Sequence, residues 1–300
     1  MKVGALMPVG DTDGPDGMPT FAEALAFARA LEAGGLDSGW LADHFFHRDT
    51  SGQVAGLHEA WTWLAGIAAG TSRIELGHLV LCTSFRPPAL TAKLAVTLDS
   101  ISNGRFVLGL GCGWHEAEFQ AMGLPFDHRV GRFEEALAII ASLLRGDEVT
   151  VHGQWYDADA AVLAPKPTRH IPILVAARRD RMLDLAARHA DAWNTAWYGA
   201  PDDRLAAQVQ AFDSALAAAG RTRDDCQVTV GINVRDDDQP APSEPDQRAL
   251  AGSIDDLAAT LRRYEDLGVA HVMAVLEPMT VRSVERLAEA VHRWRGRAAG

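Results

Sequence analysis

The chain has 300 residues, of which 48% are hydrophobic, so it can bury a large core without disulfide or metal staples. Its 40 acidic residues outnumber 28 basic ones, giving a formal charge of −12, which would repel nucleic acid and anionic membranes. Three cysteines without CxxC or metal spacing, an N-terminal apolar run too short for a signal peptide, and no membrane-length apolar stretch predict a cytoplasmic protein.

Short apolar runs alternate with segments in which apolar residues recur every three or four positions. The short runs predict strands at residues 3–7, 39–42, 74–81, 106–110, 171–175, 192–195, 228–234 and 271–276. The periodic segments predict helices at residues 21–33, 59–69, 89–100, 132–144, 181–189, 203–219, 254–266 and 281–292. Eight strands alternating with eight helices predict an α/β fold, a closed (β/α)8 TIM barrel. An open, doubly wound sheet is the alternative.

Two segments interrupt this alternation. Residues 146–169 are too long for an ordinary loop and predict an insertion with a short β-hairpin at the barrel mouth. Residues 236–247 are polar and rich in proline, which predicts a mobile loop. Neither segment has the character of a domain boundary, so we expect one barrel domain over residues 1–300.

Reactive groups in such barrels lie where the strands end at their carboxyl edge. Asp43 and His44 follow the second predicted strand, and a histidine can exchange a proton near neutral pH. A helix cap or a loop hydrogen bond would explain the same two residues equally well. Together with His47 they also suggest a metal site, but the fifth, sixth and eighth strand ends supply no histidine. We therefore expect no metal.

Two further strand ends have features of a cofactor site. Gly109, Gly111 and Gly113 would let a flat ring or a phosphate approach the backbone, although glycines also serve tight turns. After the fifth strand, arginines stand where a helix begins, and free amides there favour an anion. Solvated surface arginines are the alternative. Cys82 and Cys112 would end neighbouring strands, where buried, unreactive thiols are expected.

Several segments together resemble one known family over nearly the whole chain. They are residues 86–93, 98–106, 109–119, 122–123, 129–135 and 187–194. The pattern is similar to the luciferase-like monooxygenase superfamily, and most similar to its branch that uses the deazaflavin coenzyme F420. Relatives that use flavin mononucleotide (FMN) share the fold and much of the pattern.

The resemblance implies a role for each matching residue. His44 would donate or accept a proton beside the deazaflavin ring, oriented by Asp43, and the Leu79–Val80 bond matches a cis peptide behind that ring. The segment after the fifth strand matches the family's phosphate loop, although relatives have glycines where this chain has two alanines and two arginines. The cofactor-binding residues expected are Asp43, His44, Leu79, Val80, Gly111, Gly113, Ala176, Ala177, Arg178 and Arg179.

The function expected from this resemblance is hydride transfer between coenzyme F420 and a small organic substrate. The first alternative is a monooxygenase that uses reduced FMN and oxygen, and the second is a ligand-binding barrel without catalysis. The resemblance also implies a homodimer. Neither the substrate nor the direction of hydride transfer can be inferred from these motifs.

Overall fold

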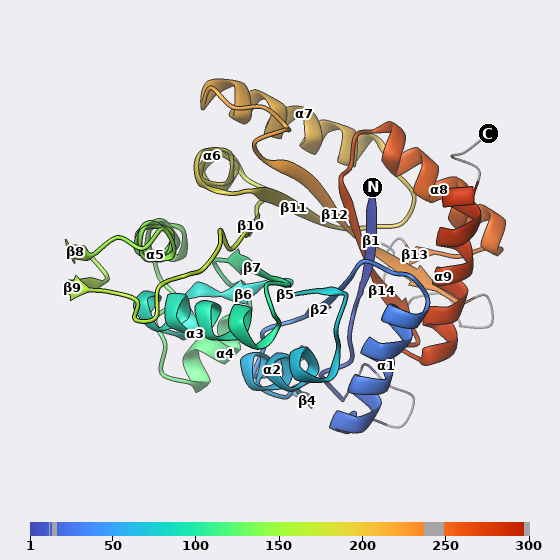
Figure 1. The fold of residues 1–300 in the computed structure, drawn as a ribbon, viewed down its shortest axis with the longest axis horizontal. Helices are drawn as coiled ribbons and strands as arrows, with labels where there is room; N and C mark the ends of the chain where they lie inside the picture. Colours follow the sequence, from blue (N-terminus) through green and yellow to red (C-terminus); the bar gives the residue numbers. More distant parts are fainter. Residues whose placement is uncertain (12, 14–16, 237–248, 297–300) are drawn as a thin grey trace.

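The computed structural model describes residues 1–11, 13, 17–236 and 249–296. Within these ranges, eight parallel strands form a closed barrel (Figure 1). The order of neighbouring strands is β10, β11, β12, β14, β1, β2, β5 and β7, and the barrel closes because β7 also pairs with β10. The barrel strands are β1 (Lys2–Leu6), β2 (Ser38–Leu41), β5 (Glu75–His78), β7 (Phe106–Gly111), β10 (Ile173–Ala176), β11 (Ala192–Tyr198), β12 (Gln227–Arg235) and β14 (His271–Glu277). The closed barrel predicted from the sequence is confirmed, and the open sheet is wrong.

Helices alternate with these strands along the chain and pack on the outside of the barrel (Figure 1). Side chains cap the first turns of α1, α2, α7 and α8, and in α1 Thr20 and Glu23 form a reciprocal capping box. The helices of this outer layer are α1 (Phe21–Ala33), α2 (Ala60–Gly70), α3 (Pro88–Ile101), α5 (Arg129–Leu144), α6 (Asp180–His189), α7 (Asp203–Ala218), α8 (Ile254–Asp266) and α9 (Val281–Gly296).

The barrel has a small apolar centre as well as a large core between sheet and helices. The central cluster comprises Leu6, Trp40, Leu79, Leu174 and Met273, each from a different strand or strand end and each less than one tenth exposed. These side chains fill the barrel, so its interior is a packed core and ligands must bind at its rim.

The predicted third strand is divided in the structure. It separates into β5 and the short β6 (Leu81–Cys82), with a cis peptide bond between Leu79 and Val80 at the break. Strand β6 continues in parallel register with β7, pairing Cys82 with Gly111.

The glycines of β7 are required by close contacts inside the protein. A Cβ on Gly109 would lie 1.9 Å from the carbonyl oxygen of His78, and one on Gly111 would lie 2.6 Å from Cγ2 of Val80. These glycines let β7 approach the broken third strand, which explains them without a ligand.

Replacing Gly109 by alanine is expected to destabilise the fold by about 2 kcal/mol, because a backbone carbonyl cannot move away as a flexible side chain can. Gly296→Ala is the control, since no atom lies within 4 Å of the added Cβ. Urea unfolding midpoints measure the difference. Equal stability of the two variants would show that β5 and β7 are not packed this closely.

Residues 146–169 contain the antiparallel pair β8 (Val149–His152) and β9 (Asp157–Ala161). The tip of this hairpin is held by Glu135 in the middle of α5, whose carboxylate accepts hydrogen bonds from the amides of Gln154, Trp155 and Tyr156. None of these residues lines the pocket described below. Of the predicted mobile loop, residues 237–247 lie outside the described residues.

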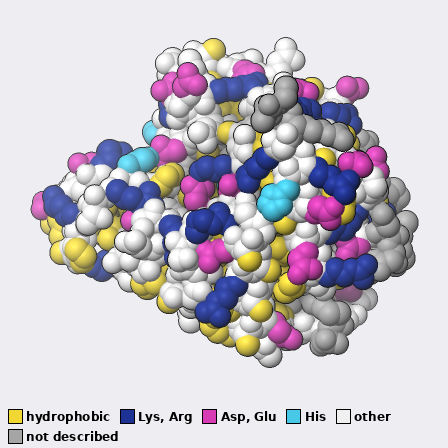
Figure 2. All heavy atoms as spheres, turned by 45° about the vertical axis from the view of Figure 1, so that its right-hand side comes forward, with side chains coloured by type: hydrophobic (Ala, Val, Ile, Leu, Met, Phe, Trp, Pro, Cys, Tyr) yellow, Lys and Arg dark blue, Asp and Glu magenta, His cyan; other side chains and the backbone are white. Residues whose placement is uncertain are grey.

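Short elements that the periodicity did not predict occur between the strand ends and the helices. They are β3 (Phe46–Arg48), β4 (Val54–Gly56), the 3-10 turn η1 (Thr83–Phe85), α4 (Glu116–Ala121) and β13 (Ala249–Leu250). No helix in the described ranges combines the length and the apolar character needed to cross a membrane. On the face in Figure 2, acidic and basic side chains are interspersed, so neither sign of charge dominates that surface.

Candidate active site

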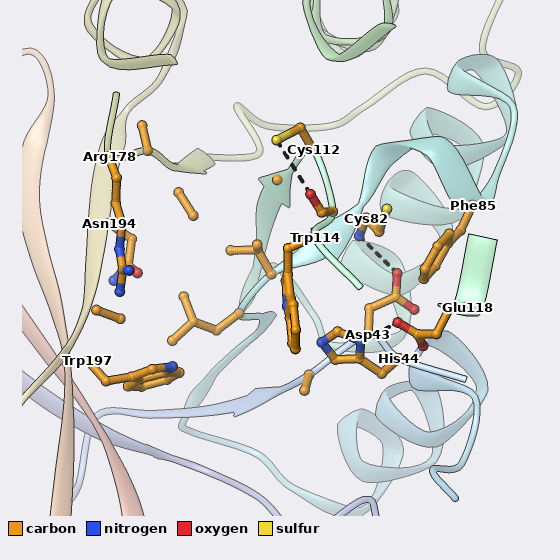
Figure 3. A pocket seen from close by; sticks show the side chains of 18 of the residues that line it. Asp43, His44, Cys82, Phe85, Cys112, Trp114, Glu118, Arg178, Asn194 and Trp197 are labelled. Carbon is orange, nitrogen blue, oxygen red and sulfur yellow. Dashed lines mark hydrogen bonds and ion pairs between the residues drawn. The ribbon is translucent and has the colours of Figure 1, made fainter. Parts of the chain in front are cut away.

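A pocket of about 630 Å³ opens at the carboxyl ends of the barrel strands. Its volume is that of a site for a cofactor or a small organic ligand. Figure 3 shows His44, Asp43, Glu118 and Phe85 on one side, and Arg178, Asn194 and Trp197 on the other. The lining residues are Leu6, Ala42, Asp43, His44, His47, Leu79, Val80, Cys82, Phe85, Gly111, Cys112, Gly113, Trp114, Glu118, Phe119, Ala176, Ala177, Arg178, Asn194, Thr195, Ala196 and Trp197.

The structure brings nearly all of the sequence-predicted site residues to this pocket. Arg179 is the exception, because it occupies the N-cap position of α6 with an exposed side chain outside the lining. The residues that do line the pocket are Asp43, His44, Leu79, Val80, Gly111, Gly113, Ala176, Ala177 and Arg178.

His44 is held by a carboxylate from a different element. Its Nδ1 lies 2.7 Å from Oε2 of Glu118, which is on α4 and fully buried. The other oxygen of Glu118 accepts hydrogen bonds from the amides of Phe45 and Phe46. This arrangement places a proton on Nδ1 and leaves Nε2, which bonds to no described residue, for a ligand in the pocket.

Asp43 does not orient His44, so that part of the sequence prediction is wrong. Its carboxylate instead forms a two-point contact with Arg86, at 2.9 and 3.0 Å, and accepts the amide of Cys82 at 3.0 Å. Arg86 also donates to Glu59, which caps α2. Asp43 therefore ties the end of β2 to β6 and to the start of α2. Consecutive residues of an extended chain point to opposite sides, which is why the two neighbours have different partners.

Glu118 remains ionised although it is buried. Burial raises the pKa of its carboxyl, but the hydrogen bonds from His44 and from two amides together lower the pKa by more. The pKa therefore falls below the ordinary 4.5. A carboxyl pKa that is lower in the folded state stabilises the fold above pH 4.5, and that contribution is lost as the pH falls through the lowered value.

Glu118→Gln is expected to lower turnover about tenfold, because a neutral acceptor holds His44 less firmly than a charged one. The stability difference between wild type and variant should shrink as the pH falls from neutral to about 4. Urea titrations at both pH values measure it, with Glu116→Gln on the exposed side of α4 as the control. A difference independent of pH would mean that Glu118 is not ionised in the folded protein.

His44 belongs to a group of rings at the pocket entrance. The centroid of His47 lies 4.4 Å from that of His44, and Trp114 lies 5.6 Å from His44 and 6.1 Å from His47. Burial, reinforced by the nearby His44, lowers the pKa of His47 to about 4. The His47 ring is therefore uncharged at neutral pH.

Neither pocket cysteine has the environment of a nucleophile. Burial raises the pKa of the Cys82 thiol to about 12 and also raises that of Cys112. Both remain protonated at neutral pH and pack as small apolar groups. Among the described residues, no group of three or more His, Cys, Asp or Glu side chains is arranged to hold a metal ion.

The rest of the pocket lining combines an apolar surface with a cation. Leu79 and Val80, joined by the cis peptide, form part of the lining just after β5. Ala176 ends β10, and Ala177 follows it toward the first turn of α6. Arg178 lines this end and makes no hydrogen bond or ion pair with any described residue. An apolar wall and an unpaired arginine beside a helix start suit a ligand with a flat ring and a phosphate.

Sequence reasoning missed three residues that matter here. Glu118 and Arg86 hold His44 and Asp43, while Trp114 forms a wall of the pocket. Trp197, one of the tryptophans that the sequence suggested for either a pocket or the core, also lines it. Trp114 and Glu118 lie in the segment that follows the end of β7, so their place after a strand end could have indicated them. Nothing in the sequence alone pairs Arg86 with Asp43, which lies 43 residues away.

Comparisons with known proteins agree on one family. A model described as luciferase-like monooxygenase matches residues 1–271. The F420-dependent glucose-6-phosphate dehydrogenase of Kineococcus radiotolerans is 33% identical over 230 residues, which cover 75% of this chain and 67% of that protein. The pyrimidine monooxygenase RutA of Pantoea ananatis is 33% identical over 138 residues, covering 44% of this chain and 38% of that protein. The solved structure of monooxygenase RslO1 from Streptomyces bottropensis shares the fold, with a TM-score of 0.82, 22% identity and 100% coverage of both chains.

Proposed function

Because the chain belongs to the luciferase-like monooxygenase family, we propose that it transfers a hydride between coenzyme F420 and a small organic substrate. The observation that carries this proposal is the pair of His44 and Glu118 at the end of β2, which presents one ring nitrogen to the pocket. The likeness to an F420-dependent dehydrogenase over 75% of the chain supports the choice of cofactor.

The residues present fit a deazaflavin. Leu79 and Val80 would lie against one face of the ring, and Arg178 with the first amides of α6 would bind the phosphate. The pocket of about 630 Å³ accommodates a ring system with a substrate beside it. Alanines at positions 176 and 177 hold the backbone farther from a phosphate than glycines would, and the charge of Arg178 compensates.

When bound, a deazaflavin supplies a ring carbon that accepts or donates a hydride. His44 would take the substrate's proton at Nε2 when the substrate is oxidised, or return it when the substrate is reduced. Glu118 would stabilise the positive charge that His44 then carries and keep the ring in one orientation. Asp43 and Arg86 would act through the backbone, by fixing the position of the loop that bears His44.

The alternative is a monooxygenase that uses reduced FMN. The similarity to a pyrimidine monooxygenase favours it. FMN carries a terminal phosphate, which Arg178 would bind in the same way.

Parallel assays of the purified protein with each cofactor distinguish the two functions. We expect F420 to bind and to be reduced or reoxidised in the presence of a substrate, and we expect no oxygen uptake with reduced FMN beyond that of free flavin. Oxygen uptake that requires both reduced FMN and an organic substrate would support the alternative. Failure to bind either cofactor would point to a binding protein without catalysis.

A further inference from the structure

The walls around His44 consist of neutral rings. Trp114 is 63% exposed, an unusual degree for so large an apolar side chain, and it lies in the pocket lining. The ring of His47 is nearly parallel to it, at 24°, and that of His44 is nearly perpendicular, at 71°. Phe85 completes this side of the pocket (Figure 3). An exposed flat ring in a pocket is a surface on which another flat molecule can stack.

This wall is fixed in place by polar contacts behind it. Glu118 on α4 accepts the amides of Phe45 and Phe46, and Nε2 of His115 accepts the amide of Arg48. The strand β3 is thereby attached to the turn that carries Trp114. The aromatic surface is thus built into the fold before any ligand binds.

Every charged group on this side of the pocket already has a partner. Asp43 is 3% exposed and is neutralised by Arg86, while Glu118 is fully buried and paired with His44. The neutral His47 adds no charge. Any positive charge on His44 is balanced by the carboxylate of Glu118, so this side of the described lining offers no unpaired cation to bind an anionic group.

The unpaired cation of the described lining lies elsewhere. Arg178 follows β10 and is beside Asn194 and Trp197, across the pocket from His44 (Figure 3). In the proposed function this arginine is occupied by the phosphate of the cofactor. An anionic substrate at His44 would then be desolvated without a counter-charge, which is strongly unfavourable.

We propose that the substrate of this site is an uncharged molecule with a flat, apolar body, such as an aromatic alcohol or carbonyl compound, which stacks on Trp114. This inference rests on the proposed function, because it assigns Arg178 to the cofactor. The proposed substrate class differs from that of the relative described as a glucose-6-phosphate dehydrogenase, since a sugar phosphate presents an anion and no flat face.

Matched ligands test the proposal on the protein with oxidised F420 bound. Calorimetry compares 2-naphthylmethanol, the same molecule with a carboxylate at position 6, and glucose 6-phosphate. We expect the neutral compound to bind at least about tenfold more tightly than the carboxylate, because the charge has no partner near His44. We expect no measurable binding of glucose 6-phosphate. Equal or tighter binding of either anion, or no binding of the neutral compound, would overturn the proposal.

Two variants identify the stacking surface. Trp114→Ala is expected to weaken binding of 2-naphthylmethanol roughly tenfold. Met122→Ala removes another exposed apolar side chain just after α4, outside the pocket, and should leave binding unchanged. If Trp114→Ala binds the compound as wild type does, the stacking surface is not Trp114 and the proposal is wrong.

A titration with F420 alone, performed first, separates this inference from the proposed function. If F420 binds but the anionic compounds are preferred, the substrate class is wrong and the proposed function stands. If F420 fails to bind but the cofactor-free protein still prefers the neutral compound and loses it in Trp114→Ala, the proposed function is wrong and the aromatic site remains.

Discussion

His44→Ala is expected to reduce turnover by about 10² to 10⁴-fold while F420 still binds. The reason is that, in the proposed function, Nε2 of His44 would transfer the proton, whereas the ring and phosphate of the cofactor would be held by Leu79, Val80 and Arg178. Steady-state kinetics measure the loss, and a cofactor titration measures binding.

Two further variants make this prediction specific. His44→Gln retains an amide donor for Glu118 but cannot exchange a proton, so it should fold normally and lose the same activity. His152→Ala removes a histidine that is 75% exposed on the hairpin, and it should keep wild-type turnover. Normal turnover in His44→Gln would show that His44 does not transfer the proton.

Arg86→Met is expected to lower the free energy of unfolding by about 3–5 kcal/mol, because it leaves the buried carboxylate of Asp43 without its counter-charge. Methionine retains most of the apolar stem, so the loss reports the charge and its hydrogen bonds. Burial lowers the pKa of the Arg86 guanidinium, but Asp43 and Glu59 raise it by more, so the group is firmly charged in the folded protein. Urea unfolding measures the change.

Arg132→Met is the matched control for Arg86→Met. Its partner Asp127 is 62% exposed, so removing that ion pair should cost less than about 1 kcal/mol. The double variant Asp43→Asn with Arg86→Met should recover part of the lost stability, because the unpaired charge is then absent. Equal losses in Arg86→Met and Arg132→Met would show that the pair of Asp43 and Arg86 is not buried as described.

The barrel was predictable because its periodicity is local. Helices α1 and α8 begin and end at the residues predicted from spacing alone, and the other strands and helices of the barrel differ by a few residues at most. The break after β5 was not visible as a pattern, since Leu79, Val80 and Leu81 continue an apolar run. Only the family resemblance indicated it.

The candidate site was predictable by position and only partly by chemistry. A residue at a strand end must lie near the mouth of a barrel, and Asp43, His44 and Arg178 do line the pocket there. Partners were not predictable, because hydrogen bonds between loops depend on side-chain directions that spacing does not specify. Thus Glu118, 74 residues from His44, makes the contact to the His44 ring that was predicted for Asp43.

The central claim is that this pocket holds a redox ring whose phosphate is bound by Arg178. Equilibrium titration with F420, followed by the cofactor's fluorescence, tests it in wild type, Arg178→Ala and Arg179→Ala. We expect affinity to fall roughly tenfold or more in Arg178→Ala, because a charged contact to phosphate is lost, and to stay unchanged in Arg179→Ala. Equal affinity in all three proteins, or no binding by wild type, would contradict the account.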